Sequence, residues 1–269
     1  MLIVLIILVL LIAFYLLSTM CRKGHKGLET LQVWAYAHRG LHGNGIPENS
    51  LLAFRKAKEA GYGIELDVHL LADGNLAVMH DASLKRTTGQ DGFIEDLTTE
   101  QLSEFYLENT LQTIPQFQQV LDLYNGAAPI IVELKCERNN YAALCETACK
   151  MLDNYHGVYC LESFDPRCIH WLKKHRPELI RGQLAENYFR TPKSKLPWYL
   201  KLALSCQMMN FLNLPDFISY RFKDRKHISN VICRKLWGAQ GVTWTIRNEG
   251  DFQKAVEENW IPIFEGFLP

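Results

Sequence analysis

The sequence predicts an α/β fold, a (β/α)8 TIM barrel, and three observations support this prediction. The chain has 269 residues, a length that a single barrel of this kind commonly has. Short apolar runs alternate with helical patterns, which is typical of repeated βα units. Nine of these runs are strand candidates, and one of the nine is explained as a return strand, which leaves the eight strands that a barrel requires.

The strand candidates follow one another from residue 33 to residue 264. They occupy residues 33–37, 63–69, 76–80, 129–134, 158–162, 180–184, 217–220, 241–245 and 261–264. Only about six residues around Asp73 and Gly74 join the second candidate to the third, whereas a parallel crossover needs a dozen or more. These two strands are therefore predicted to form a β-hairpin, and a small insertion, about residues 81–112, is expected after it.

The first twenty residues, MLIVLIILVLLIAFYLLSTM, carry no charged side chain. As a helix they would be about 30 Å long, close to the thickness of a bilayer core. We expect a transmembrane anchor over residues 1–20, a linker over 21–32 and the barrel domain over 33–269. A cleaved signal peptide is the alternative, but no basic segment precedes the apolar run and no small-residue cleavage site follows it.

The charges next to the apolar run predict its orientation. Arg22, Lys23 and Lys26 follow the run directly, so the positive-inside rule places the catalytic domain in the cytoplasm. Eight cysteines without CxxC spacing agree with a reducing compartment. The expectation is thus a single-pass protein of the cell membrane, with the lipid bilayer as a partner.

Composition and motifs exclude several classes of function. Lys plus Arg and Asp plus Glu each total 29, so the chain has no overall basic field of the kind that drives nucleic-acid binding. The sequence contains no GxSxG, P-loop or HExxH motif. Any site for an anion must therefore be local, and neither zinc nor a nucleotide is indicated by spacing.

Acidic residues occur where two predicted strands end, which is the catalytic end of such a barrel. Glu65 and Asp67 are two residues apart in IELDVHL, so both side chains point to one face. VELK repeats the pattern, with Glu133 as a third oxygen ligand and Lys135 as a fixed positive charge. Oxygen ligands of this type suit Ca2+ or Mg2+. The alternative is a buried salt-bridge cluster of these acids with Arg39 and Lys135.

Two histidines, His38 and His80, stand at predicted strand ends, with the carboxylates between them in the sequence. Imidazole titrates near neutral pH, so the pair suggests an acid and a base. Arg39 suits a phosphate group because of its planar donor fork. Asn49 either caps the helix that begins near PENS or points toward the site.

These motifs together resemble the glycerophosphodiester phosphodiesterase family, of the phosphatidylinositol phospholipase C-like barrel superfamily. The resemblance rests on HRG (38–40), PENS (47–50), ELDVHLLADGNLAVMHD (65–81), ELK (133–135), SFDP (163–166) and VTWT (242–245). It covers nearly everything from Val33 to the end, with the motifs in order. It implies a barrel with a small insertion after the hairpin.

The resemblance also implies a role for each motif residue. His38 and His80 would be the acid–base pair, and Arg39 and Lys135 would contact the phosphate. A divalent cation, Ca2+ or Mg2+, would be bound by Glu65, Asp67 and Glu133, and Trp244 would line the glycerol or leaving-group side. Family members usually close the last strand with Thr-Asp, and Glu265 in IFEGFLP would replace that aspartate.

The expected reaction is hydrolysis of a glycerophosphodiester to glycerol 3-phosphate and an alcohol through a cyclic phosphate. The first alternative is a lysophospholipase D that acts on membrane lysophospholipids. The second alternative is a membrane-tethered binding protein without turnover, which would not need an acid–base pair. The sequence does not predict an oligomeric state.

Overall fold

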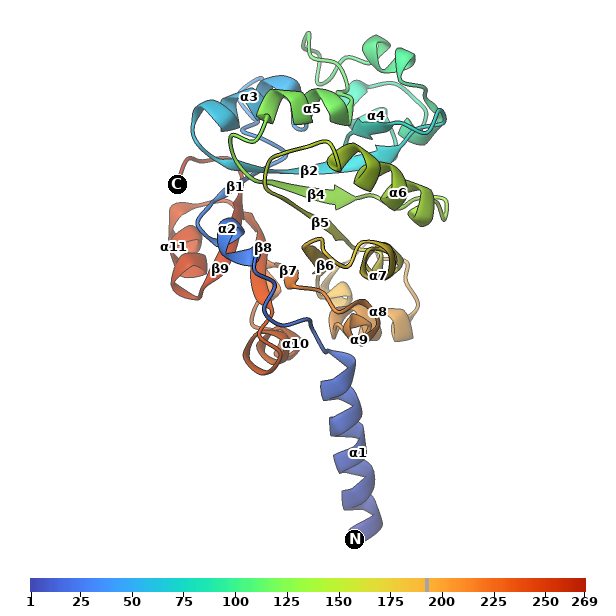
Figure 1. Ribbon diagram of the computed structural model, residues 1–269, viewed down its shortest axis with the longest axis vertical. Helices are drawn as coiled ribbons and strands as arrows, with labels where there is room; N and C mark the ends of the chain where they lie inside the picture. Colours follow the sequence, from blue (N-terminus) through green and yellow to red (C-terminus); the bar gives the residue numbers. More distant parts are fainter. Residues whose placement is uncertain (192–193) are drawn as a thin grey trace.

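In the computed structural model of the chain, which describes residues 1–191 and 194–269, eight parallel strands close into a barrel (Figure 1). The neighbours in the sheet follow the order β1-β9-β8-β7-β6-β5-β4-β2-β3, and an additional pairing of β1 with β2 closes the ring. The strands are β1 Tyr36–His38, β2 Gly63–Leu70, β3 Leu76–Val78, β4 Ile130–Leu134, β5 Tyr159–Ser163, β6 Arg181–Ala185, β7 Phe217–Arg221, β8 Gln240–Ile246 and β9 Trp260–Phe264.

The strand β3 is the exception to the parallel arrangement. It pairs with β2 in an antiparallel register, with Val68 opposite Val78 and Leu70 opposite Leu76. It lies beside the barrel at the end of the strand order and takes no part in closing the ring. The predicted barrel is thus confirmed, and the strand that the short connection marked as a hairpin return is antiparallel.

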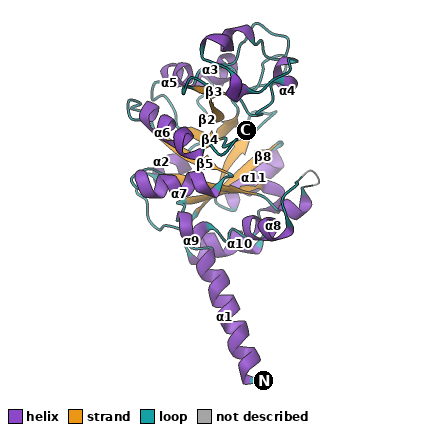
Figure 2. Cartoon of the chain, turned by 90° about the vertical axis from the view of Figure 1, so that its right-hand side faces the viewer, coloured by secondary structure: helices purple, strands orange, loops and turns teal. Residues whose placement is uncertain are grey.

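Most helices pack around the outside of the ring, whereas α1 projects away from it, as the two views in Figures 1 and 2 show. Two precede the barrel, α1 Leu2–Ser18 and α2 Leu28–Gln32. The others are α3 Leu51–Glu59, α4 Lys85–Thr88, α5 Phe117–Tyr124, α6 Tyr141–Leu152, α7 Pro166–His175, α8 Trp198–Ser205, α9 Asn210–Asn213, α10 Ile228–Val231 and α11 Glu249–Glu257.

The barrel interior changes from apolar to polar along the strands. Tyr36, Ile131 and Cys160 belong to one buried apolar cluster from three different strands. Because side chains on one face of a strand recur every second residue, the next inward positions on β1, β4 and β5 are two residues further on. On β4 and β5 these positions are Glu133 and Glu162, so acidic side chains lie directly above an apolar layer.

The short helix α2 covers the apolar end of the barrel. Leu28 and Leu31 of this helix are buried in the same cluster as Phe217 and Ile261. The hydroxyl of Tyr36 donates a hydrogen bond to the backbone oxygen of Leu31 over 3.1 Å. The segment before the first strand therefore closes one end of the barrel, and the polar end remains for a functional site.

The connection after β3 forms a small apolar cluster of its own. Leu84, Ile94, Leu102 and Leu107 are buried together with Met79, which follows β3. The cluster holds α4 and the turns that follow it against the hairpin. Chain segments next to His80 are thereby fixed without a long helix.

The prediction of a transmembrane anchor is wrong. The apolar run forms α1, which has 17 residues and a length of about 26 Å at a rise of about 1.5 Å per residue, less than the roughly 30 Å of a bilayer core. Within residues 1–191 and 194–269, no helix has both the length and the apolar character needed to cross a membrane. The expected single-pass location in the cell membrane, with a cytoplasmic catalytic domain, rested on this anchor and is therefore not supported either.

The end of α1 has a local physical cause. The hydroxyl of Ser18 bonds to the backbone oxygen of Tyr15 over 2.7 Å, and that of Thr19 bonds to Leu16 over 2.8 Å. The indole nitrogen of Trp237 also donates to the oxygen of Leu16, over 3.1 Å. Helix carbonyls that would continue the helix are thus satisfied by side chains, one of them from the barrel.

We expect Gly40→Ala to destabilise the fold by roughly 2–4 kcal/mol, as the sum of a left-handed backbone and overpacking. Gly40 has φ +81°, and an added Cβ would lie 2.8 Å from the carbonyl carbon of Ala53 in α3. Gly74→Ala is the matched control, since Gly74 has φ +84° and open space around it. Urea unfolding should show a smaller loss for the control, and equal losses would contradict a tight contact between Gly40 and α3.

Candidate functional site

Three carboxylates from two neighbouring strands converge at the polar end of the barrel. Glu65 and Asp67 lie on β2 and Glu133 lies on β4, and the register pairs Asp67 with Glu133. One oxygen atom from each of the three lies within 4.8 Å of the other two. All three side chains are buried. The structure therefore brings together the residues that the sequence suggested as oxygen ligands.

The cluster holds more negative charge than its own cations neutralise. Glu162 of β5 joins it, since the register pairs Glu162 with Glu133 and burial together with Glu133 raises its pKa. Burial, followed by repulsion from Asp67 and Glu133, raises the pKa of Glu65 well above its usual value. These shifts indicate carboxyl groups that lack enough positive charge around them.

Two cations lie against the same carboxylates. Lys135 Nζ is 2.9 Å from Glu133 Oε1 and 3.3 Å from Asp67 Oδ1, and Arg39 Nε is 3.4 Å from Asp67 Oδ2. Burial alone would raise the pKa of Asp67, but Lys135, His80 and Arg39 outweigh it and hold that pKa well below its usual range. Arg39 and Lys135 also line two different cavities next to the cluster.

Asn49 points at the site and does not cap the helix. Its Nδ2 donates to Asp67 Oδ2 over 2.9 Å, while Ser50 caps α3 by accepting from the backbone nitrogen of Ala53. Asn49 has φ +51°, and its backbone nitrogen donates to the oxygen of Arg39 over 2.9 Å. The loop that begins with HRG is thereby tied to the start of α3.

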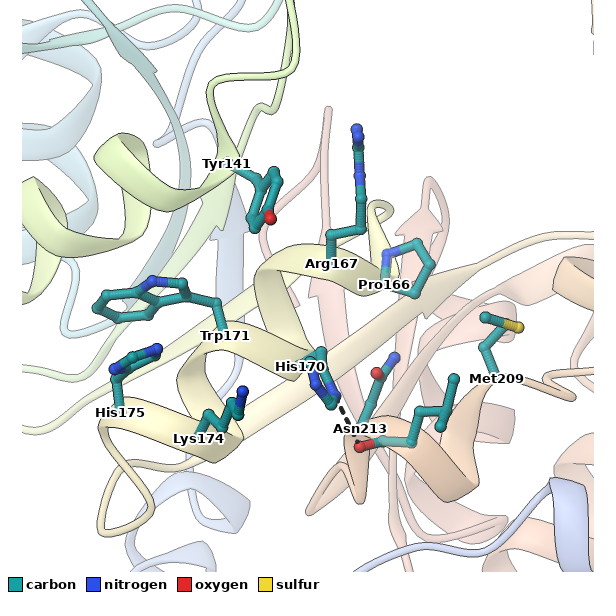
Figure 3. A pocket seen from close by; sticks show the side chains of 10 residues that line it. Tyr141, Pro166, Arg167, His170, Trp171, Lys174, His175, Met209 and Asn213 are labelled. Carbon is teal, nitrogen blue, oxygen red and sulfur yellow. Dashed lines mark hydrogen bonds between the residues drawn. The ribbon is translucent and has the colours of Figure 1, made fainter.

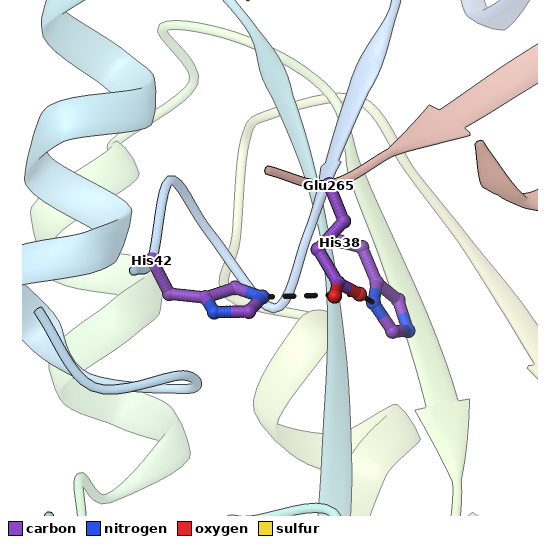
Figure 4. Close-up of side chains that lie close together, drawn as sticks. All are labelled: His38, His42 and Glu265. Atoms are coloured by element: carbon purple, nitrogen blue, oxygen red, sulfur yellow. Dashed lines mark hydrogen bonds and ion pairs between the residues drawn. The ribbon is translucent and has the colours of Figure 1, made fainter. Parts of the chain in front are cut away.

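His38 stands at the end of β1 between two carboxylates. Its Nδ1 lies 2.6 Å from Glu265 Oε2 (Figure 4). Its Nε2 lies 3.9 Å from Glu65 Oε2. Burial, supported by the charge of Arg39, lowers the pKa of His38 to about 4 despite the opposing effect of Glu265. With Nδ1–H donating to Glu265, Nε2 of the neutral ring can accept a proton.

His80 reaches the cluster from the segment after β3. Its Nδ1 bonds to Asp81 Oδ1 over 2.6 Å, and its side chain is 32% exposed. A positive charge on His80 would lower the pKa of both Asp67 and Glu133, so its ring lies within electrostatic range of them. Asp81 thus fixes one nitrogen of an imidazole that is partly exposed.

A chain of ion pairs connects the two histidine-bearing segments. Arg86 of α4 bonds to Asp81, and it bonds to Glu48 over 2.6 and 3.0 Å. Glu48 in turn accepts from Arg39 Nη1 over 2.9 Å. The insertion therefore helps to hold the phosphate-contact candidate Arg39 next to His38.

A cavity of about 460 Å³ opens over this arrangement, and His38, Arg39, Trp244 and Glu265 line it. Trp244 lies edge-on to Phe164, with ring centroids 5.6 Å apart. Its indole nitrogen is buried without a hydrogen-bond partner among the described residues. Trp244 therefore contributes an aromatic side chain to the wall of this cavity.

A second cavity of about 610 Å³ adjoins the cluster on the side of β4 and β5. Glu133 and Lys135 form part of its wall. The rest includes apolar side chains from the connection between β6 and β7, namely Tyr188, Leu196, Leu200, Ala203, Leu204 and Met209. The lining of this cavity therefore combines charged and apolar side chains.

Another groove, of about 370 Å³, lies on the outside of the barrel between α6, α7 and α9 (Figure 3). Trp171 stacks on His175 there at 4.5 Å, and Nδ1 of His170 donates to the backbone oxygen of Leu212 over 3.1 Å. None of the side chains lining this groove is a predicted site residue. It is therefore separate from the carboxylate cluster.

The sequence pointed to the ligand and histidine positions but did not assign roles to Glu48, Glu162 or His42. Glu162 stands at a predicted strand end, and its place level with Glu133 could have assigned it to the carboxylate cluster. Glu48 and His42 lie in a loop, and their neighbours depend on backbone conformations that no residue pattern specifies. Glu265, which was expected to replace a family aspartate, bonds directly to His38.

Comparison with known proteins agrees with this geometry. The profile of the glycerophosphoryl diester phosphodiesterase family matches residues 38–264. A glycerophosphodiester phosphodiesterase from Caldanaerobacter subterraneus subsp. tengcongensis is 27% identical over 234 residues, which cover 82% of this chain and 88% of the relative. One from Bacillus altitudinis is 41% identical over 113 residues, or 39% of this chain and 46% of the relative.

A solved structure has the same fold. The phosphodiesterase from Oleispira antarctica in complex with its product sn-glycerol-3-phosphate superposes with a TM-score of 0.70 at 22% identity, covering 86% of this chain and 92% of that one. The family profile spans most of the chain, from the first histidine to the last strand. The chain therefore belongs to the glycerophosphoryl diester phosphodiesterase family and is an enzyme of that class.

Proposed function

We propose that the chain hydrolyses glycerophosphodiesters at the carboxylate cluster, with one divalent cation held by Glu65, Asp67 and Glu133. The observation that carries this proposal is the charge of the cluster. Four buried carboxyl groups face the cations Arg39 and Lys135, so two negative charges remain to be balanced when all four are ionised. One divalent cation supplies that charge, and oxygen ligands favour Ca2+ or Mg2+.

The donor set fits such a cation. The three oxygen atoms lie close enough to share one ion, and Glu162 Oε2 is buried without a hydrogen-bond partner among the described residues. When bound, the cation offsets negative charge that develops on the phosphoryl oxygens. Arg39 and Lys135 bind the same phosphate from the protein side and orient it.

The two histidines divide the proton transfers. His38 is neutral at physiological pH because of its low pKa, so it accepts the proton of the glycerol hydroxyl next to the phosphate. That oxygen attacks phosphorus and the bond to the alcohol breaks, while His80 gives the alcohol its proton. Water then opens the cyclic phosphate as His80 takes a proton from it and His38 returns one to the glycerol oxygen.

The first test is release of choline from glycerophosphocholine with and without EDTA. We expect turnover to stop with EDTA and to return on addition of Ca2+ or Mg2+. A substrate analogue that lacks the glycerol hydroxyl next to the phosphate should react at least about a thousandfold more slowly, because it cannot form the ring. Unchanged hydrolysis of this analogue would contradict the cyclic phosphate and leave the metal requirement standing.

The second candidate function is lysophospholipase D activity on single-chain lysophospholipids. The apolar wall of the cavity that shares Glu133 and Lys135 favours it, since an acyl chain could lie along Leu200, Ala203 and Leu204 while the phosphate meets the cluster. The alternative of a binding protein without turnover is not retained, because the chain belongs to an enzyme family.

We expect Ala203→Trp to slow release of choline from lysophosphatidylcholine in detergent by about tenfold or more, because the indole fills the space for a chain. The same variant should hydrolyse glycerophosphocholine at the wild-type rate, since that substrate has no acyl chain. An equal loss of rate on both substrates would mean that the cavity next to Glu133 and Lys135 does not bind the acyl chain.

A further inference from the structure

A group of metal-ligating side chains lies beside the carboxylate cluster, on the other face of His38. It consists of His38, His42 and Glu265 (Figure 4), and one ligand atom from each lies within 4.8 Å of the other two. Glu265 Oε2 is 2.6 Å from His38 Nδ1 and 4.0 Å from His42 Nε2. The carboxylate thus sits between two imidazoles.

The local fold brings His42 to this position. The loop after β1 turns back at Gly40, and the backbone nitrogen of Leu41 donates to the oxygen of Ala53 in α3 over 3.0 Å. The next ring, that of His42, points toward the end of β9. Its Nε2 is buried and has no hydrogen-bond partner among the described residues. This nitrogen is therefore available for a further ligand.

There is also room next to the three side chains. His38 and Glu265 line the cavity of about 460 Å³, and His42 and Glu265 line a neighbouring one of about 290 Å³. The group forms part of the wall between these two spaces. A bound ion could take a water molecule from either side as a fourth ligand.

The donor set differs in kind from that of the carboxylate cluster. Two imidazole nitrogens and one carboxylate are typical of zinc and related transition metals, whereas three carboxylates suit Mg2+ or Ca2+. In a tetrahedral zinc site with bonds of about 2.0 Å, the ligand atoms are roughly 3.3 Å apart. The distances from Glu265 to the two imidazoles bracket this value, so small side-chain rotations are enough.

We propose that His38, His42 and Glu265 form a second metal site, selective for Zn2+ or a similar transition metal, whose occupation stops hydrolysis. The inhibitory part rests on the proposed role of His38. A metal on Nδ1 leaves the only ring proton on Nε2, and a ring in this state cannot accept the proton of the substrate hydroxyl. Zinc would thus act as an inhibitor while the carboxylate cluster keeps its own cation.

The test uses the full chain with millimolar Mg2+ present to occupy the carboxylate cluster. Zinc binding is measured by equilibrium dialysis, and Co2+ is used as a spectroscopic probe of the ligands. We expect one tight zinc per chain, a Co2+ spectrum of nitrogen and oxygen ligands, and loss of choline release on zinc addition. His42→Ala and His42→Gln should need at least about tenfold more zinc for half-inhibition, each relative to its own rate without zinc.

His156→Ala is the matched control, because His156 is an exposed histidine far along the chain from the group. It should bind zinc and respond to it as the wild type does. Equal zinc binding by the His42 variants, or a Co2+ spectrum with thiolate bands from the cysteines, would overturn the site. Zinc bound in the expected stoichiometry without loss of activity would overturn the inhibition only. Absence of any turnover without zinc would contradict the proposed hydrolysis and not the zinc site.

Discussion

We expect His38→Ala and His80→Ala each to hydrolyse glycerophosphocholine at least about a thousandfold more slowly than the wild type, in line with the usual range for acid–base catalysis. The KM should change little, because the phosphate contacts Arg39 and Lys135 remain in place. The two variants should respond differently to the leaving group. p-Nitrophenol leaves without a proton, so a p-nitrophenyl ester of glycerol phosphate should restore much of the rate of His80→Ala and little of that of His38→Ala.

The measurements are steady-state release of choline and of p-nitrophenol, with His156→Ala as a control for loss of an exposed histidine. Circular dichroism and the melting temperature check that each variant is folded. Recovery of His38→Ala and not of His80→Ala would reverse the two roles. Activity within tenfold of the wild type in either variant would remove that histidine from the mechanism.

We expect Glu65→Gln to abolish cation-dependent turnover, with a loss of at least about a hundredfold, and at the same time to stabilise the metal-free protein. Removal of one carboxylate weakens cation binding, and it also relieves repulsion from Asp67 and Glu133. Differential scanning fluorimetry in EDTA should show a higher melting temperature for the variant. Millimolar Ca2+ or Mg2+ should raise the melting temperature of the wild type more than that of the variant.

The pH dependence of the metal-free wild type follows from the raised pKa of Glu65. The folded protein keeps a proton that the unfolded chain releases near pH 4.5, so stability falls as the pH rises above this value. Added cation should therefore raise the melting temperature more at pH 8 than at pH 5.5. A metal-free melting temperature that rises over this range, or a Glu65→Gln variant less stable than the wild type, would contradict a repulsive cluster. Glu104→Gln, at an exposed position, is the control for an acid-to-amide substitution.

Much of the barrel could be predicted from the sequence because its signals are local. The short connection around Asp73 and Gly74 marked a hairpin, and the two-residue spacing of Glu65 and Asp67 put both on the interior face. The spacing of VELK added Glu133 at the matching level of the next strand. Strand periodicity and connection length depend only on neighbours in the sequence, which is why these features were visible.

The errors and omissions concern features that depend on distant contacts. The apolar composition of the first segment did not reveal that Ser18 and Thr19 end the helix, or that Trp237 bonds to its last turn. The group around His42 forms only when the loop after β1 meets the residue that follows β9. Neither contact leaves a periodic pattern in the sequence. The assignments of the acid–base pair, the phosphate contacts and the metal ligands stay predictions until the variants are measured.

The closure of the barrel floor by α2 has a kinetic consequence. The apolar layer inside the barrel and Leu28 and Leu31 next to it fill this end, so substrate enters and product leaves at the polar end. The phosphate monoester product must leave this opening before another diester substrate can bind. Accumulated glycerol 3-phosphate would therefore compete with the substrate for the same opening, and the reaction would slow as product builds up.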